Sequence, residues 1–144
     1  TVYMFGGSDG SRSTYFNQVF KWNLTAGSNA WFEPIANTPS NVFVSSFTNS
    51  AVCIDDLIYF LGTKPNEEVI YIFDTVLETW TSPGNLPWSR RYGCVATNNT
   101  HLFMADGHDG SNITRNADIN IYDIAQQSWT SIPLSLSVLG GWSE

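Results

Sequence analysis

The sequence contains little charge, only two cysteines and no long hydrophobic run. Charged residues make up 13% of the 144 residues, and six Lys and Arg against thirteen Asp and Glu give a net charge of −7. A negative chain repels phosphate backbones and anionic lipid head groups, so we expect no nucleic-acid partner. No apolar run approaches the roughly 20 residues that span a bilayer, and we therefore expect no membrane insertion.

The two cysteines, Cys53 and Cys94, are too few for a disulfide framework and lack the close spacing with histidine of a zinc site. We expect them to be buried free thiols, the usual state of unpaired cysteine. Apolar residues reach 42%, which excludes a disordered segment and predicts one folded domain. The chain begins with Thr1 and not Met, so we expect a processed protein or a piece of a longer one.

A strand-like pattern occurs three times along the chain. An apolar, aromatic run that ends in or beside glycine is found at Thr1–Gly7, Leu57–Thr63 and His101–Gly107. Each run is typical of a buried strand that stops at a residue tolerant of positive φ. A further short run precedes the second and third copies, at Ser50–Asp55 and Tyr92–Asn98.

A second type of strand follows each of these runs and ends in a residue that favours a turn. The three copies are Gln18–Asn23, Val69–Asp74 and Ile119–Ile124. Their polar ends are Asn23, Asp74 and Asp123, side chains that accept hydrogen bonds from the following turn. A tryptophan then begins the next strand, at Trp31, Trp80 and Trp129, with 49 residues between successive copies.

Each unit thus contains four short strands, and the chain is predicted to be all-β. Units of this kind, with glycine after the second strand (Gly6, Gly7, Gly62, Gly107) and tryptophan in the fourth, resemble kelch repeats, which build β-propellers. The resemblance implies structural roles for these glycines, tryptophans and turn residues. The double glycine of the family is intact only at Gly6 and Gly7, which indicates a diverged or galactose-oxidase-type kelch propeller.

The period divides residues 1–144 into about three four-stranded antiparallel blades, approximately 1–40, 41–88 and 89–136. Aligning Thr1 with His101 places Glu144 opposite Thr100, so 137–144 is predicted to be the first strand of a next or first blade. Closed propellers have about 4–8 blades, so three do not close. We expect the ends of this single propeller segment to be completed by another copy or by the rest of a longer chain.

The loops that join strands two and three, and strands four and one, emerge on one face of such a propeller. They are predicted at Ser8–Asn17, Lys64–Glu68, Gly84–Arg91 and His108–Asp118. These loops contain all four arginines, and kelch propellers bind partners through such loops. The predicted partner-binding residues are Arg12, Tyr15, Trp88, Arg90, Arg91, His108 and Arg115. The alternative is a set of solvated loops without a specific partner.

The remaining motifs do not indicate catalysis or a cofactor. Asp106, His108 and Asp109 have the spacing of metal ligands, but no glutamate follows to complete a calcium loop, and we expect no metal. The copper ligands of galactose oxidase find no matching motif in the chain. The sequence therefore does not predict an enzyme.

Three glycosylation sequons begin at Asn23, Asn98 and Asn112, and all lie in predicted turns. They favour a secreted or cell-surface glycoprotein, with a cytoplasmic location as the alternative. The leading hypothesis is a non-catalytic extracellular module that assembles through unpaired blade edges and presents a loop face to protein or glycan partners. The alternatives are an intracellular kelch adaptor that binds actin or a ligase substrate, and the propeller part of a carbohydrate oxidase.

Overall fold

The protein is all-β in the part of the chain that the computed structural model describes. That part comprises residues 1–7, 16–26, 32–39, 42–43, 51–62, 64–65, 68–89, 93–105, 107 and 118–133. Its one helical element is the short 3-10 turn η1 (Leu24–Ala26). Within these residues no helix has the length and apolar character needed to cross a membrane.

Three antiparallel sheets follow one another along the chain. The first sheet contains β1 (Val2–Phe5), β2 (Gln18–Trp22) and β3 (Glu33–Asn37). The second sheet contains β5 (Ala51–Ile54), β6 (Leu57–Phe60), β8 (Val69–Asp74) and β9 (Thr79–Asn85). The third sheet contains β10 (Cys94–Thr97), β11 (His101–Ala105), β12 (Ile119–Asp123) and β13 (Ser128–Ile132).

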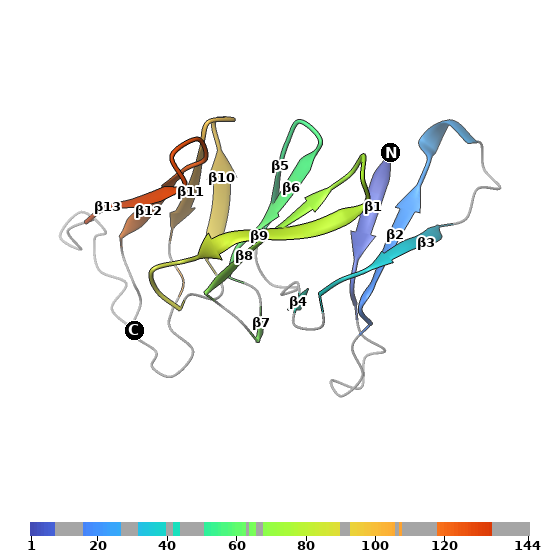
Figure 1. Cartoon of the computed structure of the whole chain (residues 1–144), viewed down its shortest axis with the longest axis horizontal. Helices are drawn as coiled ribbons and strands as arrows, with labels where there is room; N and C mark the ends of the chain where they lie inside the picture. The colour runs from blue at the N-terminus through green and yellow to red at the C-terminus, as the bar shows by residue number, and fades with distance from the viewer. Residues whose placement is uncertain are drawn as a thin grey trace, which may run out of the picture.

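The three sheets stand side by side in chain order, with the second sheet between the other two (Figure 1). The innermost strands β5 and β10 of the second and third sheets are neighbours. In the first sheet β1 is an edge strand, and no described strand takes the place that β5 and β10 occupy in the other sheets. Residues 137–144, the predicted extra strand, lie outside the described part of the chain.

Strand registers show that the sheets follow one plan. Leu57 pairs with Asp74 in the second sheet, and His101 pairs with Asp123 in the third. Likewise Val2 pairs with Trp22, as Leu102 pairs with Tyr122. Because side chains alternate along each strand, these registers define which positions are equivalent from sheet to sheet.

Two hydrophobic cores hold neighbouring sheets together. The first interface, between the first and second sheets, buries Val19, Phe60, Tyr71 and Phe73. The second interface lies between the second and third sheets and is mostly aliphatic. Its buried residues are Ile54, Tyr59, Leu61, Ile70, Leu86, Val95, Leu102, Met104 and Tyr122. Among the described residues, the middle sheet is therefore covered on both faces, and each outer sheet on one.

Two predicted loops contain strand residues. Lys64 and Pro65 form β7, which pairs with β4 (Val42–Phe43). The partner lies far away in the sequence, so local turn composition gives no sign of this pairing. Strand β9 continues to Asn85, because a register shift between Ile70 and Ile72 allows β8 to pair further along it.

The prediction that both cysteines are buried is wrong. Cys53 and Cys94 are free and exposed, although Ile54 and Val95 beside them are buried. The alternation of side chains turns each thiol to the opposite side of its strand. On that side the described residues provide no neighbouring inner strand, since the first sheet lacks one and the third sheet is the last.

Candidate functional site: the two end faces

The first interface is an aromatic cluster built from alternate positions of β1, β6, β8 and β9. The ring of Phe5 lies 4.8 Å from that of Phe60, 5.3 Å from that of Phe73 and 5.7 Å from that of Trp80, measured between centroids. Tyr3 meets Phe73 edge-on at 5.9 Å. Such edge-to-face pairs add roughly 0.5–1.5 kcal/mol each beyond the burial of apolar area.

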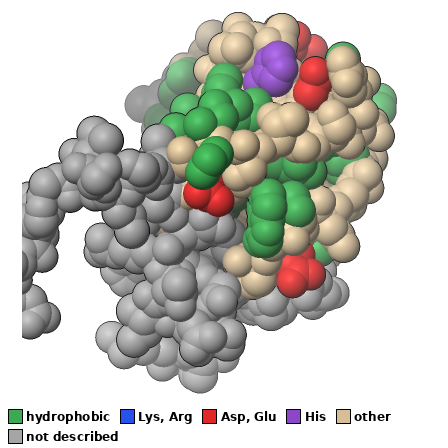
Figure 2. All heavy atoms as spheres, turned by 90° about the vertical axis from the view of Figure 1, so that its left-hand side faces the viewer, with side chains coloured by type: hydrophobic (Ala, Val, Ile, Leu, Met, Phe, Trp, Pro, Cys, Tyr) green, Lys and Arg blue, Asp and Glu red, His purple; other side chains and the backbone are tan. Residues whose placement is uncertain are grey.

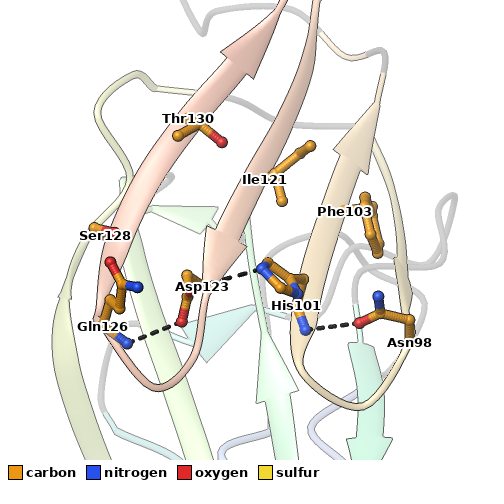
Figure 3. Close-up of a pocket in the computed structure, with 8 residues that line it drawn as sticks. All are labelled: Asn98, His101, Phe103, Ile121, Asp123, Gln126, Ser128 and Thr130. Atoms are coloured by element: carbon orange, nitrogen blue, oxygen red, sulfur yellow. Dashed lines mark hydrogen bonds and ion pairs between the residues drawn. The ribbon is translucent and has the colours of Figure 1, made fainter.

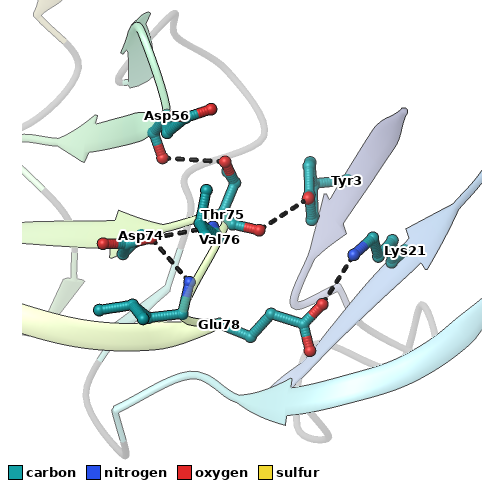
Figure 4. A network of polar contacts seen from close by, with 8 residues as sticks. Tyr3, Lys21, Asp56, Asp74, Thr75, Val76 and Glu78 are labelled. Carbon is teal, nitrogen blue, oxygen red and sulfur yellow. Dashed lines mark hydrogen bonds and ion pairs between the residues drawn. The ribbon is translucent and has the colours of Figure 1, made fainter.

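Polar contacts surround this cluster (Figure 4). Lys21 donates to Glu78 Oε1 at 2.7 Å across the interface, and this hydrogen bond raises the pKa of Lys21. The Tyr3 hydroxyl donates to the carbonyl oxygen of Thr75 at 3.3 Å. The turn that contains Thr75 is fixed by Asp74, whose Oδ1 accepts from two backbone N–H groups at 2.8 Å.

The second interface uses the equivalent positions with different residues. Leu61 stands where the first interface has Phe5, and Met104 where it has Phe60. Tyr59 and Tyr122 occupy the places of Tyr3 and Phe73. Burial, with a smaller effect of Asp55, raises the pKa of Tyr59. Burial followed by the proximity of Tyr59 and Asp123 raises the pKa of Tyr122.

The outer face of the first sheet repeats the pattern of positions that is buried at both interfaces. We call it the N-terminal end face, and its residues are Val2, Met4, Phe20, Trp22 and Phe32. Met4 is equivalent to the buried Phe60 but is 44% exposed, and Val2 and Phe32 are each 39% exposed. The rings of Trp22 and Phe32 lie 5.6 Å apart. The face is thus apolar, structured and uncovered by described residues.

The outer face of the third sheet contains the other set of interface positions, which in the first and second sheets pack against the next sheet along the chain. We call it the C-terminal end face, and its residues are His101, Phe103, Ala105, Ile119, Ile121 and Asp123. The positions in the second sheet equivalent to Phe103, Ala105 and Ile119 are Tyr59, Leu61 and Ile70, which are at most 4% exposed because the third sheet covers them. Figure 2 shows this side of the molecule, where hydrophobic side chains alternate with polar ones and a histidine lies beside acidic groups.

A pocket of about 360 Å³ lies on the C-terminal end face (Figure 3). Its lining residues are Asn98, His101, Phe103, Ile121, Asp123, Gln126, Ser128 and Thr130. Phe103 and Ile121 form its apolar part, and the side chains of His101 and Asp123 point toward one another. Positions equivalent to Asn98, His101, Phe103 and Ile121 are Ile54, Leu57, Tyr59 and Ile72, all of which pack in the second interface. The pocket is therefore a vacant counterpart of an inter-sheet contact.

The polar residues of the pocket fix the neighbouring turns. His101 Nε2 lies 3.6 Å from Asp123 Oδ2, and Asp123 Oδ1 accepts from the backbone N–H of Gln126 at 2.9 Å. The Thr100 hydroxyl lies 2.9 Å from Asn98 Oδ1, to which it donates, and 2.9 Å from His101 Nδ1. The arrangement is suited to holding the ends of β11 and β12 together.

Most of the predicted partner-binding residues lie outside the described part of the chain. These are Arg12, Tyr15, Arg90, Arg91, His108 and Arg115. Trp88 is described, follows β9 and is 42% exposed. The partner-binding loop face consequently stays a prediction.

Two of the three sequons are described, and both are exposed. Asn23 Oδ1 accepts from the backbone N–H and the hydroxyl of Thr25, at 3.1 and 2.8 Å. Asn98 makes the same contacts with Thr100 at 3.1 and 2.9 Å. The turn between β10 and β11 and the short helix η1 lie along the same upper edge of the molecule in Figure 1. Asn112 lies outside the described residues.

The residues with predicted structural roles take two kinds of position. Gly6, at the end of β1, has a φ of 62°, and a Cβ there would lie 3.2 Å from the carbonyl oxygen of Phe16. Gly7, Gly62 and Gly107 also have positive φ. Trp80 packs in the first interface and Trp129 in the second, where its ring lies 5.0 Å from Tyr122. Trp31 lies outside the described residues.

The metal-like cluster of Asp106, His108 and Asp109 also lies outside the described part. Within the residues that are described, no group of three or more His, Cys, Asp and Glu side chains is placed to hold a metal ion. No cofactor site can be assigned to these residues.

The end faces were not among the sites predicted from the sequence. Alternation of apolar residues shows that a strand has two faces, but it does not show which sheet covers each face. The useful signal is the repeat itself, because it makes Phe103 equivalent to Tyr59 and Trp22 equivalent to Phe73.

No protein-family model matches the chain, and no curated protein is found to be similar to it. The fold assignment depends on the three equivalent sheets, which are compatible with a β-propeller-like arrangement.

Proposed function

We propose that the chain is a kelch-type propeller segment and acts as a non-catalytic extracellular structural and binding module. Its end faces are docking surfaces for further blades, and its loop face binds protein or glycan partners. One observation carries the proposal. The positions that are exposed or only half-buried on the two end faces are equivalent to positions that pack in the cores between the sheets.

The energetic reason is the cost of leaving these faces in water. Val2, Met4 and Phe32 on the N-terminal end face keep 39–44% of their surface exposed, and Ile132, which pairs with Ile119 of the C-terminal end face, keeps 49%. Apolar area removed from water contributes roughly 25 cal/mol per Å², so covering both faces stabilises the segment substantially. Exposed β-sheet edges such as that of β1 also template pairing with another strand.

A tandem chain tests the docking role. A second copy fused directly after Glu144 continues the repeat register, since Glu144 aligns with Thr100 and Thr1 with His101. The fusion places the C-terminal end face of one half beside the N-terminal end face of the other. We expect the tandem to unfold at a clearly higher urea concentration than the single chain, compared at nanomolar concentration.

The matched control is a tandem that carries Trp22→Glu in its second half only. This variant places a charge where the equivalent Phe73 is fully buried, so the part of the gain that comes from the contact at the fusion point should be lost. Equal urea midpoints for the single chain and both tandems would show that the end faces do not dock further blades.

The extracellular part of the proposal has its own test in a glycosylating secretory host. Asn23 is exposed in a turn, and we expect glycan mass that Asn23→Gln removes. An unmodified secreted chain would argue against the glycoprotein and in favour of an intracellular module.

A further inference from the structure

The two end faces of this chain complement each other. Each sheet has a preceding-side face, which is turned toward the sheet before it in the chain, and a following-side face, which is turned toward the sheet after it. The first interface joins the following-side face of the first sheet to the preceding-side face of the second, and the second interface repeats that arrangement. The C-terminal end face is a following-side face, and the N-terminal end face is a preceding-side face. One chain therefore presents both halves of a third interface at its opposite ends (Figure 1).

The repeat shows which residues meet when these halves dock. Phe103 takes the place of Tyr3, and Trp22 takes the place of Phe73, a pair whose rings lie 5.9 Å apart in the first interface. Ala105 takes the place of Phe5, and Met4 that of Phe60, a pair at 4.8 Å. The pocket beside Phe103 and Ile121 is thus placed to receive an aromatic side chain.

Charge does not oppose this contact although the chain has a net charge of −7. The N-terminal end face residues Val2, Met4, Phe20, Trp22 and Phe32 are all uncharged. On the C-terminal end face Asp123 already lies 3.6 Å from His101. Docking consequently brings no like charges of these two faces together.

We infer that the occupant of each end face is a second copy of the chain, arranged head to tail, so that two copies close a ring of six blades. The inference rests on the proposed docking role of the end faces. Two copies contribute six sheets, within the range of about 4–8 blades over which propellers close. Three copies would contribute nine, outside that range. Head-to-tail contacts form closed rings only where the rotation closes, which favours the pair.

The arrangement has a consequence for the Asn98 sequon. Asn98 lines the pocket, and the equivalent Ile54 is only 8% exposed in the second interface. A glycan on Asn98 would occupy the space of the docked sheet. Asn98 is therefore unmodified in the pair, and modification of Asn98 keeps the chain single.

Native mass spectrometry and light scattering of the purified chain at micromolar concentration test the inference. We expect a species of about 32 kDa, twice the 16.0 kDa of one chain. A 16 kDa species overturns the second copy as the occupant, and a ladder of larger species overturns the closed ring. A single chain together with a stabilised tandem would leave the docking role intact while removing this inference.

Two variants define the orientation of the contact. Phe103→Glu and Trp22→Glu each disable one end face, so each alone should be a single chain. Mixed together they retain one intact pair of faces, Trp22 of the first variant against Phe103 of the second, and should form a 1:1 heterodimer weaker than the native pair. Two-fold symmetric pairing through one face predicts instead that one variant stays dimeric.

Val76→Glu is the matched control, because Val76 lies in the turn between β8 and β9 and is 68% exposed. It should leave the pair unchanged. Near-UV circular dichroism of all variants shows whether the Trp80 and Trp129 environments are native. Variants that keep this signal and remain dimeric would contradict the assignment of the end faces as the contact.

Discussion

The two interfaces within the chain occupy the same positions of the repeat but are built from different chemistry. The first is aromatic, with Phe5, Phe60, Phe73 and Trp80 in mutual contact, and has an ion pair beside it. The second is mainly aliphatic around Leu61, Ile70, Leu102 and Met104. The same repeat positions are therefore buried at both interfaces, while residue type is free to vary provided that the space is filled.

Because the two interfaces differ in residue type, the end faces can occupy the same repeat positions although their residues match neither interface. Trp22 and Met4 on one face, and Phe103 and Ile121 on the other, stand at interface positions with yet another combination of side chains. The following predictions separate the interfaces from one another and from the end faces.

Phe73→Ala should have the largest effect, because Phe73 is fully buried and contacts three other aromatic rings. Removing a buried phenyl ring costs roughly 3–5 kcal/mol of unfolding free energy. Urea denaturation at nanomolar concentration measures it. The matched variant Trp22→Ala, at the equivalent end-face position, should cost less there, because Trp22 is only half-buried. Equal losses would remove the distinction between covered and uncovered faces.

Leu102→Ala tests the contribution of the second interface to the free energy of unfolding. Leu102 is fully buried between the second and third sheets, and truncation of a buried leucine costs roughly 2–5 kcal/mol. Hydrogen exchange should show faster opening of β10–β13 than of β1–β3. Uniform loosening of all three sheets would indicate that the interfaces are not separate units.

Alkaline pH should weaken the second interface through Tyr59 and Tyr122. Burial raises the pKa of both phenols, so the folded state favours their neutral form. This contribution is fully present below the unfolded pKa of about 10 and is lost as the pH rises through the higher folded values. Urea midpoints between about pH 8 and pH 11 should fall less for Tyr122→Phe than for the native chain. Parallel falls would exclude Tyr122 as a cause.

Lys21→Met should have the smallest effect. The pair of Lys21 and Glu78 is about one-third exposed, and exposed ion pairs contribute little. Its hydrogen bond raises the pKa of Lys21, so the contribution is present below about pH 10 and lost as the pH rises further. We expect a small decrease in the urea midpoint that disappears in about 1 M salt. Glu78→Gln, which removes the carboxylate charge at nearly the same size, should lower the urea midpoint by a similar amount. A decrease that does not depend on salt would indicate lost packing of the Lys21 aliphatic chain.

The repeat made most of the strands and turns predictable. Asp74 and Asp123 accept the expected backbone hydrogen bonds, and strands occur at the three copies of each run. The exposure of Cys53 and the β4–β7 pair were not predictable from local pattern, because both depend on which distant strand lies alongside. The sequence predicted that the ends of the segment are completed, but it did not show which residues form the end faces, since burial of a sheet face depends on its neighbour.

Cross-linking is the most direct test of the claim that the end faces meet as the internal faces do. Met4→Cys and Ala105→Cys are placed on separate chains that also carry Cys53→Ser and Cys94→Ser, because the native thiols are exposed. The equivalent side chains Phe60 and Phe5 have ring centroids 4.8 Å apart. A short bis-maleimide should therefore link the two chains to each other. A mixture that yields no mixed product, or only links between identical chains, would contradict the account.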